Sequence, residues 1–388
     1  MTTFSVRFLG CKVSHVDAHE VRERLLADGH EERDDADVAI VNTCCVTNEA
    51  VAKSRKEAAR AARSHRRVYV TGCGANLAAD AFAGLPENVV VVARRSEETP
   101  AFVAGDVGAI ACVQADARLD RVRAFVKIQD GCSFGCSFCV IPLVRGPSRS
   151  RSAESVLGEI RRRVAQGHRE VVLTGINLGC YRDLPGLVRE AGALVERLRL
   201  SSIEINHVSD ALVAALRETP AVSRHLHVPL QSGDDGVLLD MRRRYSVATY
   251  LRRLAPLRDE FNLTSDVIVG FPTEDEHAFA NTLATVREAG LTKVHVFPYS
   301  PRPGTATASD DSVPPQVKKA RGALLRAVSH DACLARWRTK IGRDDRVLVD
   351  RPGRGYGDDY SPWLVDAPVG EFVRVRGAEV TKEGVRAD

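Results

Sequence analysis

The sequence predicts an α/β protein with an N-terminal parallel α/β domain, a central incomplete TIM-like barrel and a small all-β barrel at the C-terminus. Strand-like and helix-like runs alternate over the first 340 residues, and the middle of the chain repeats that unit six times. The last segment holds only strand-like runs. The expected domains are residues 1–115, 116–338 and 339–388.

In the N-terminal domain, three strand-like runs are each followed at once by a cysteine. The pairs are SVRFLG with Cys11, DVAIVNT with Cys44 and RVYVTG with Cys73. Helical patterns separate the runs, so we expect parallel neighbouring strands whose carboxyl ends lie along one edge of a sheet. The three thiols would then converge. The alternative is three buried cysteines that happen to end strands, since free cysteine is among the most buried residue types.

The central part of the chain carries six further strand-like runs, separated by amphipathic helical patterns such as 155–167 and 276–290. The expected strands are 124–129, 171–176, 201–205, 225–230, 265–271 and 293–299. Active sites of TIM-like barrels lie on the loops that leave the carboxyl ends of the strands. The first such loop holds Cys132, Cys136 and Cys139, which we therefore expect at the mouth of the barrel.

The C-terminal segment contains the runs DRVLVD, SPWLVD and GEFVRVRG, which predict the strands of a small β-barrel. From Leu348 to the end it holds eight Asp and Glu against six Lys and Arg. A barrel that binds RNA is expected to be basic, so the net negative charge of this segment argues against tight binding of RNA.

Composition is that of a globular protein, with 388 residues, 44% of them hydrophobic, and a net charge of +4 that favours no class of partner. The first residues lack a basic stretch followed by an apolar one, and no run approaches the roughly 18 apolar residues of a membrane span. We therefore expect a cytoplasmic protein without membrane contact. Ten cysteines in such a protein indicate metal or redox chemistry more than a disulfide framework.

The three cysteines of the barrel loop are one too few for a closed metal site. Three thiolates can hold a 4Fe-4S cluster by three of its irons and leave the fourth iron open for a ligand, much as a catalytic zinc keeps one open position. A zinc site is the alternative, but structural zinc sites recruit a fourth protein ligand, and no histidine lies near these cysteines in the sequence.

The spacing C-x3-C-x2-C after the first barrel strand resembles the radical S-adenosylmethionine (SAM) superfamily. Motifs in the order LGCKVS, VNTCCVT, TGCGAN, LTGINLG, HVPLQSGDDGVL, DVIVGFPTE and FPYSPRPGT make the chain similar to the radical SAM methylthiotransferases over about residues 5–305. Within that family, LTGINLG and HVFPYSPRPGT look closest to the MtaB branch, which modifies N6-threonylcarbamoyladenosine beside the tRNA anticodon. The C-terminal segment resembles the TRAM domain of the family.

The resemblance implies two 4Fe-4S clusters and SAM as cofactors. It assigns Cys11, Cys44 and Cys73 to an auxiliary cluster, and Cys132, Cys136 and Cys139 to the catalytic cluster that binds SAM. Cys45 stands where the family usually has threonine. It could replace Cys44 as a ligand, but side chains alternate along an extended strand, so only one of the two thiols is expected to face the site. We favour Cys44 for its register with the strand.

Candidate SAM contacts lie at the ends of later barrel strands. They are Thr174, Gly175 and Asn177 at the second strand, where the superfamily binds the SAM amino group, and Ser202, Glu204, Gln231 and Ser232 farther along. Polar residues at strand ends also cap the helices that follow, which is the structural alternative. Cys112, Cys180 and Cys333 match no motif and are interpreted as structural.

The resemblance further implies that an unactivated C–H bond is replaced by C–SCH3, with one electron from a donor such as flavodoxin or ferredoxin. Basic groups favour the tRNA anticodon loop as the substrate, namely Arg145, Arg149 and Arg151 on a loop expected to be exposed, and Arg242, Arg243 and Arg244. The acidic C-terminal segment leaves methylthiolation of a peptide or a ribosomal-protein residue as the alternative. A non-catalytic iron-sulfur protein that binds RNA is the second alternative.

Overall fold

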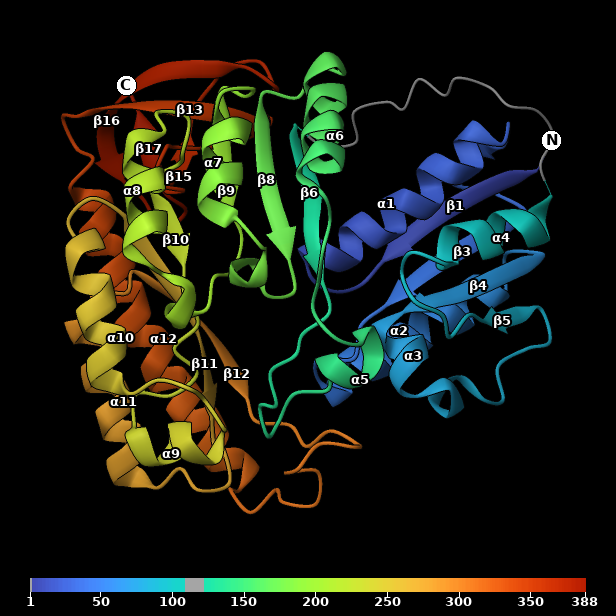
Figure 1. The fold of residues 1–388 in the computed structure, drawn as a ribbon, viewed down its shortest axis with the longest axis horizontal. Coiled ribbons are helices and arrows are strands. Elements are labelled where there is room, and N and C mark those ends of the chain that lie inside the picture. The colour runs from blue at the N-terminus through green and yellow to red at the C-terminus, as the bar shows by residue number, and fades with distance from the viewer. Residues whose placement is uncertain (1, 109–121) are drawn as a thin grey trace. The chain divides into compact units, whose positions relative to one another are not determined.

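The computed structural model describes residues 2–108 and 122–388, which fold into two compact units (Figure 1). The first unit contains the N-terminal segment together with Asp130–Ser148 and Ser300–Ser309. The second contains most of the central strands and the C-terminal segment. The domain boundary expected at 115/116 and Cys112 lie outside the described residues, so the expected boundaries stay a prediction. Among the described helices, none is both long enough and apolar enough to cross a bilayer.

The first unit is built on a parallel five-stranded sheet with the order β2-β1-β3-β4-β5. Its strands are β1 (Thr3–Phe8), β2 (Glu31–Glu32), β3 (Val38–Thr43), β4 (Arg67–Gly72) and β5 (Val89–Val91). Its longer helices are α1 (Lys12–Ala27), α2 (Asn48–Ala62) and α4 (Thr99–Val107), and shorter turns are α3 (Cys73–Leu77), η1 (Ala79–Phe82) and α5 (Ile141–Arg145). The predicted N-terminal parallel α/β fold is confirmed.

Strand β3 explains why both faces of this sheet are covered. Val38 and Ile40 pack in the core formed with α1 and α4, whereas Ala39 and Val41 pack in the core formed with α2. A strand that alternates apolar residues toward two hydrophobic layers must be buried on both sides, as parallel strands usually are. The sheet is therefore rigid at the edge where β1, β3 and β4 end.

The second unit contains an open arc of parallel strands. They are β6 (Arg123–Asp130), β8 (Glu170–Gly175), β9 (Arg197–Leu200), β10 (His225–His227), β11 (Asn262–Val269) and β12 (Lys293–Pro298), with the short β7 (Arg149–Ser150) beside β6. The sheets β7-β6-β8-β9 and β10-β11-β12 are joined where the Ile203 N–H donates to His227 O at 3.0 Å. The predicted incomplete TIM-like barrel is confirmed.

Helices alternate with these strands and begin where the sequence offers a cap. They are α6 (Ala153–Ala165), α7 (Leu184–Gly192), α8 (Asp210–Glu218), α9 (Asp235–Asp240), α10 (Val247–Leu254), α11 (Glu276–Glu288) and the long α12 (Pro315–Arg338). The 3-10 turns are η2 (Leu178–Cys180), η3 (Ile205–His207) and η4 (Ala255–Leu257). Side-chain oxygens of Ser152, Ser209 and Asp275 accept hydrogen bonds from the first turns of α6, α8 and α11.

One expected strand is misplaced. The sequence pattern put the third barrel strand at 201–205, but β9 spans Arg197–Leu200, and Ile205–His207 forms a 3-10 turn. Arg197 and Arg199 gave the RLRL run a polar appearance, yet both arginines are buried. Their partner is Glu170, a residue distant in the sequence, so no local pattern reveals that they face the interior.

The C-terminal segment forms a closed barrel in the order β13-β14-β15-β17-β16. Its strands are β13 (Asp344–Arg351), β14 (Arg354–Tyr356), β15 (Pro362–Leu364), β16 (Phe372–Val380) and β17 (Val385–Ala387). Trp363, Val347, Val349 and Val385 fill it, with Trp337 of α12 beside them. The predicted small all-β barrel is confirmed.

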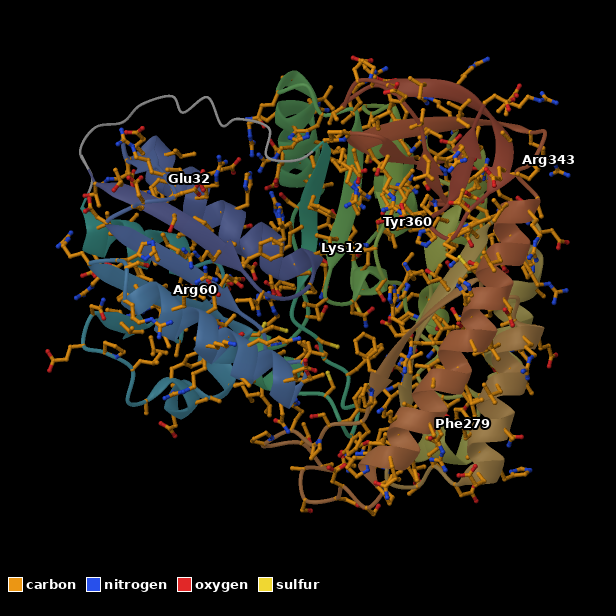
Figure 2. All side chains as sticks on the ribbon, turned by 180° about the vertical axis from the view of Figure 1, so that it is seen from behind. Lys12, Glu32, Arg60, Phe279, Arg343 and Tyr360 are labelled. Atoms are coloured by element: carbon orange, nitrogen blue, oxygen red, sulfur yellow. The ribbon has the colours of Figure 1, made fainter. Side chains whose placement is uncertain are left out.

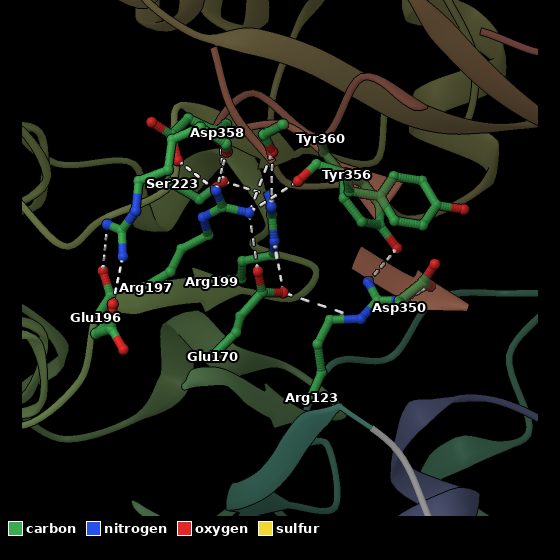
Figure 3. A network of polar contacts seen from close by, with 12 residues as sticks. Arg123, Glu170, Glu196, Arg197, Arg199, Ser223, Asp350, Tyr356, Asp358 and Tyr360 are labelled. Carbon is green, nitrogen blue, oxygen red and sulfur yellow. Dashed lines mark hydrogen bonds and ion pairs between the residues drawn. The ribbon is translucent and has the colours of Figure 1, made fainter. Parts of the chain in front are cut away.

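A buried polar network joins this small barrel to the amino-terminal ends of β6, β8 and β9 (Figure 3). Glu170 accepts from Arg199 Nε at 2.8 Å and from Arg197 Nη1 at 3.2 Å. The same guanidinium groups donate to backbone carbonyls of the small barrel, Arg197 to Tyr356 at 2.9 Å and Arg199 to Gly357 at 2.8 Å. The small barrel is thus attached to the end of the TIM-like barrel opposite the carboxyl ends of the strands.

Glu170 is the charge on which this network depends. Burial alone would raise the pKa of Glu170, but Arg199, Arg197 and Arg123 outweigh it and hold the pKa below its usual value. Arg123 extends the network to Asp350 of β13 at 3.1 Å. If Glu170 lost its charge, Arg199 would keep a buried positive charge without its carboxylate, and Arg197 would retain Asp358 at 2.6 Å; leaving a buried charge without its partner is strongly destabilising.

We expect Glu170→Gln to lower the free energy of unfolding of the second unit by about 3 to 5 kcal/mol, the usual effect of removing one partner from a buried ion pair. The measurement is urea unfolding followed by tryptophan fluorescence, because Trp337 and Trp363 both lie at the C-terminal barrel and are the two tryptophans of the chain. Glu218→Gln is the control, since Glu218 pairs with Arg189 on the surface and its loss should change stability by less than about 1 kcal/mol. Equal effects of the two substitutions would contradict the assigned role of Glu170.

Candidate functional site

Cys11, Cys44 and Cys73 lie directly after β1, β3 and β4, which are neighbouring parallel strands. Lys12, the residue after Cys11, marks this edge of the sheet in Figure 2. Burial is the main cause that raises the pKa of the Cys44 thiol, and the nearby thiols of Cys73 and Cys11 raise it further. The structure therefore brings the three cysteines together, with Cys44 and Cys73 buried and Cys11 exposed.

Cys45 also reaches this group of thiols. Strand β3 ends at Thr43, so the alternation expected to turn one of the adjacent thiols away does not extend to Cys44 and Cys45. The side chain of Cys45 is fully buried and packs in one cluster with Cys73. The neighbouring Cys45 thiol is the largest cause lowering the pKa of Cys73 to about 7, and Arg145 contributes in the same direction against the effect of burial. Both adjacent thiols therefore lie near Cys73, and the choice of Cys44 as the ligand stays a prediction.

Cys132, Cys136 and Cys139 lie on the loop between β6 and α5, within the first unit. The loop is closed by a hydrogen bond from Cys132 N to Gly146 O at 3.0 Å. Its middle is held by Thr307, whose N–H and hydroxyl both donate to Ser137 O, at 3.2 and 3.1 Å. All three cysteines are half-buried.

Gly131 allows this loop to turn sharply after β6. Its φ is +70°, and a Cβ atom added there would lie 2.1 Å from Pro147 O and 2.7 Å from Gly146 O. Both atoms belong to the backbone and cannot yield easily. Gly131 is therefore required for the loop to present Cys132 as it does.

Helix α5, which follows the loop, packs on the turn α3 that begins at Cys73. Asn76 Nδ2 donates to Val144 O at 3.0 Å, and Val140 and Val144 form one apolar cluster with Cys45 and Cys73. The loop that carries one set of cysteines is thus fixed to the turn that carries the other.

Arg145 ends α5 and is buried at this contact. Its Nε donates to Cys73 Sγ at 3.0 Å, and its two terminal nitrogens donate to Asp130 and Asp17. The sequence had suggested an exposed arginine available for RNA, and that expectation is wrong. The partners lie on separate segments of the chain, so their approach to Arg145 has no local sequence signal.

The other arginines considered for RNA binding differ in exposure. Arg149 begins β7 and is half-buried. Arg151 pairs with Glu159 at 2.6 Å, and Arg243 pairs with Glu204 at 3.4 Å, so both contribute to the fold. Arg242 and Arg244 are exposed on the connection between α9 and α10. Arg244 O accepts from Asn206 Nδ2 of η3, the turn after β9, at 3.0 Å, so this connection lies at the carboxyl-end side of the barrel, where loops carry function.

Most of the expected SAM contacts lie at strand ends of the second unit. Thr174 and Gly175 end β8, and the Asn177 N–H donates to the side chain of buried Gln129 at 2.8 Å. Glu204 caps the turn η3, and Ser232 contacts Thr282 at 3.4 Å, so both have structural partners. Ser202 bridges to His227, and Gln231 has a φ of +65°. Their roles toward SAM stay predictions.

Sequence reasoning did not single out a polar group inside the second unit. His227, Asp266 and His295 have ligand atoms within 4.8 Å of one another, and His227 Nε2 lies 3.1 Å from Asp266 Oδ2. Each residue opens a motif noted for other reasons, HVPLQSG, DVIVGF and HVFPYS.

Of the cysteines without a motif, Cys180 lies 3.5 Å from His207 Nε2, and Cys333 packs against the core of the C-terminal barrel.

Family models match two parts of the chain. The radical SAM superfamily matches residues 126–286, and an uncharacterized protein family, UPF0004, matches residues 3–93.

Curated relatives match nearly the whole chain. A threonylcarbamoyladenosine tRNA methylthiotransferase MtaB of Thermotoga maritima is 32% identical over 100% of this chain and 98% of its own length. The enzyme of the same name from Bacillus subtilis is 37% identical over 85% of this chain and 80% of its own length. A tRNA-2-methylthio-N(6)-dimethylallyladenosine synthase of Paracoccus denitrificans is 32% identical over 96% and 93%.

Among solved structures, the radical SAM methyltransferase TsrM from Kitasatospora setae, with cobalamin and a 4Fe-4S cluster bound, is similar with a TM-score of 0.58. It is 14% identical, and the match covers 79% of this chain and 77% of that one. At that identity the likeness concerns the fold alone.

We expect Gly131→Ala to disturb the loop that presents Cys132, because the added Cβ meets the backbone of Pro147 and Gly146. Anaerobic reconstitution should then load roughly half the iron of the unchanged protein, the share of one of two 4Fe-4S clusters. Gly135→Ala in the same loop is the control, since nothing lies within 4 Å of its added Cβ. Full iron loading of the Gly131 variant would show that the loop tolerates a side chain there.

Proposed function

The chain belongs to the radical SAM methylthiotransferase family, and from this premise we propose that it methylthiolates C2 of N6-threonylcarbamoyladenosine beside the tRNA anticodon. The observation that carries the choice of substrate is that relatives with this named activity match the chain over almost their whole length. As a member of the family, the protein is an enzyme that uses SAM and two 4Fe-4S clusters.

The chemistry of the cysteines fits these clusters. Thiolates are the usual protein ligands of 4Fe-4S clusters, and two separate sets of three lie in the first unit. In our proposal Cys11, Cys44 and Cys73 hold the auxiliary cluster, while Cys132, Cys136 and Cys139 hold the cluster that binds SAM. When bound, these groups supply the one-electron cleavage of SAM and the place where the methylthio sulfur is carried.

The protein's own residues supply position and shelter. The hydrogen bonds at Cys132 and Ser137 fix the loop of the SAM cluster, and the apolar side chains of Val140 and Val144 shield Cys45 and Cys73 from water. In the second unit, Gln129 holds the backbone of Asn177, and we propose that this strand end contacts SAM together with Thr174 and Gly175. Holding reactants in place and excluding water is the main contribution a protein makes to such chemistry.

We propose that a tRNA anticodon loop binds at the exposed arginines, and not at the acidic C-terminal barrel. Arg242 and Arg244 offer positive charge on a loop at the carboxyl ends of the barrel strands. The C-terminal barrel resembles an RNA-binding module, but it carries an excess of acidic residues and is fastened through the Glu170 network. We propose a cytoplasmic setting with flavodoxin or ferredoxin as the electron donor.

A peptide or a residue of a ribosomal protein is the second candidate substrate. The net acidic charge of the C-terminal barrel favours it, since a module that grips RNA should be basic. The substrate experiment below separates the two candidates.

We expect the anaerobically reconstituted protein to bind about eight irons in two clusters. Alanine at Cys132, Cys136 and Cys139 together should remove about half the iron and abolish formation of 5'-deoxyadenosine from SAM. Alanine at Cys11, Cys44 and Cys73 should remove the other half and leave SAM cleavage intact. Full iron content in either triple variant would show that the assigned cysteines are not the ligands, and absence of SAM cleavage by the unchanged protein would favour a non-catalytic iron-sulfur protein.

We expect the protein to bind and methylthiolate an anticodon stem-loop carrying N6-threonylcarbamoyladenosine. Binding should weaken as salt rises, and alanine at Arg242 and Arg244 should flatten the slope of log K against log salt by about 1.4 to 1.8 if each contacts one phosphate. Alanine at Arg63 and Arg66 is the charge-matched control, because both arginines are exposed between α2 and β4, at the amino-terminal end of that strand. An active enzyme that neither binds nor modifies the stem-loop at low salt would redirect the proposal to a peptide.

A further inference from the structure

The buried guanidinium group of Arg145 lies where the two cysteine-bearing segments of the first unit meet. Nε donates to Cys73 Sγ at 3.0 Å. Nη1 donates to both carboxylate oxygens of Asp130, at 3.0 and 3.1 Å, and Nη2 donates to Asp17 at 2.6 Å. Arg145 is 6% exposed and Cys73 is 6% exposed, so water screens this contact little.

The two aspartates fix the direction in which the guanidinium group points. Asp17 belongs to α1, the helix after Cys11, and Asp130 ends β6, two residues before Cys132. Asp130 is itself held by Ser96 at 2.8 Å and by the Gly131 N–H at 2.7 Å. Since the donors of arginine form a rigid planar fork, anchoring both terminal nitrogens leaves Nε aimed at the sulfur.

A second possible donor lies beside the same sulfur. Cys45 is fully buried and packs in one cluster with Cys73, Val140 and Val144. Cys73 therefore has a charged N–H donor at 3.0 Å and a neutral S–H group packed beside it.

We propose that Arg145 and Cys45 act on the auxiliary cluster by donating hydrogen bonds to the sulfur of Cys73, and that together they raise its reduction potential. This inference rests on the proposed assignment of Cys73 as a ligand of that cluster. Arg145 is a positioning residue in this role, because it acts through Cys73.

The direction of the effect follows from charge. Reduction adds one negative charge to the cluster, and a nearby positive charge and hydrogen bonds to the ligand sulfurs stabilise the reduced form more than the oxidised form. Removing either donor should therefore make the cluster harder to reduce. The charged donor should have the larger effect, because hydrogen bonds from ionised groups are roughly twice as strong as neutral ones.

The test uses the full-length chain with alanine at Cys132, Cys136 and Cys139, so that one cluster remains, and follows its reduction by EPR during a redox titration. In this background we expect Arg145→Gln to lower the ratio of reduced to oxidised cluster at a fixed potential about tenfold, which is a shift of about 59 mV for one electron. Cys45→Val should shift the potential in the same direction by a smaller amount. Cys45→Thr should restore the potential, because threonine has the shape of valine with a hydroxyl donor in place of one methyl group.

Arg22→Gln is the matched control. Arg22 is also 6% exposed, but its Nε donates to a carboxylate, that of Glu32, at 2.6 Å. Its substitution removes a buried charge from the same unit and should leave the potential unchanged. An equal shift in this variant would mean that loss of any buried arginine perturbs the cluster, and would overturn the specific role of Arg145.

The remaining outcomes are separable. If the background protein binds no iron, the assignment of the auxiliary cluster fails, and the inference fails with it. If the cluster is present and Arg145→Gln leaves its potential unchanged, the inference alone is overturned. If Arg145→Gln does not fold because Asp17 and Asp130 are left unpaired, the Cys45 pair decides: a shift with valine that threonine reverses supports the inference, and equal potentials overturn it.

Discussion

The first unit depends on one constraint: neighbouring parallel strands end at the same edge of a sheet, so the residues that follow them lie close together. β1, β3 and β4 are adjacent, and each is followed at once by a cysteine. Hydrophobic layers on both faces keep these strands in place, so the order of the strands alone brings the three thiols together. The loop that carries the second set of cysteines packs against this edge of the sheet through Val140, Val144 and Arg145.

Much of this architecture was predictable from the sequence, because it follows from local patterns. The N-terminal sheet, five of the six barrel strands and the terminal β-barrel were expected from runs of strand-like residues, and the fold confirms them. The cysteines after β1, β3 and β4 were expected to converge for the same reason. What failed were inferences that depend on contacts between residues distant in the sequence.

Arg197, Arg199 and Arg145 show why such contacts cannot be found in a single sequence. Each is buried, and each has carboxylate partners that are distant in sequence, Glu170 for the first two and Asp17 for the third. A single sequence shows the arginine but not the acid that neutralises it. The same limit applies to Cys45, whose position beside Cys73 depends on β3 ending at Thr43 and not continuing through the two cysteines.

The segment Ser300–Ser309 has a consequence for how the enzyme matures. Thr307 supports the loop of Cys132, Cys136 and Cys139 through Ser137, and Arg302 donates to Asn48 at 2.8 Å. These contacts join the N-terminal segment to residues made much later on the ribosome. The strands before Cys11, Cys44 and Cys73 lie within residues 1–73, whereas the loop of Cys132, Cys136 and Cys139 lacks its support until the chain has been synthesised as far as Thr307. The first unit can therefore be completed only late in synthesis.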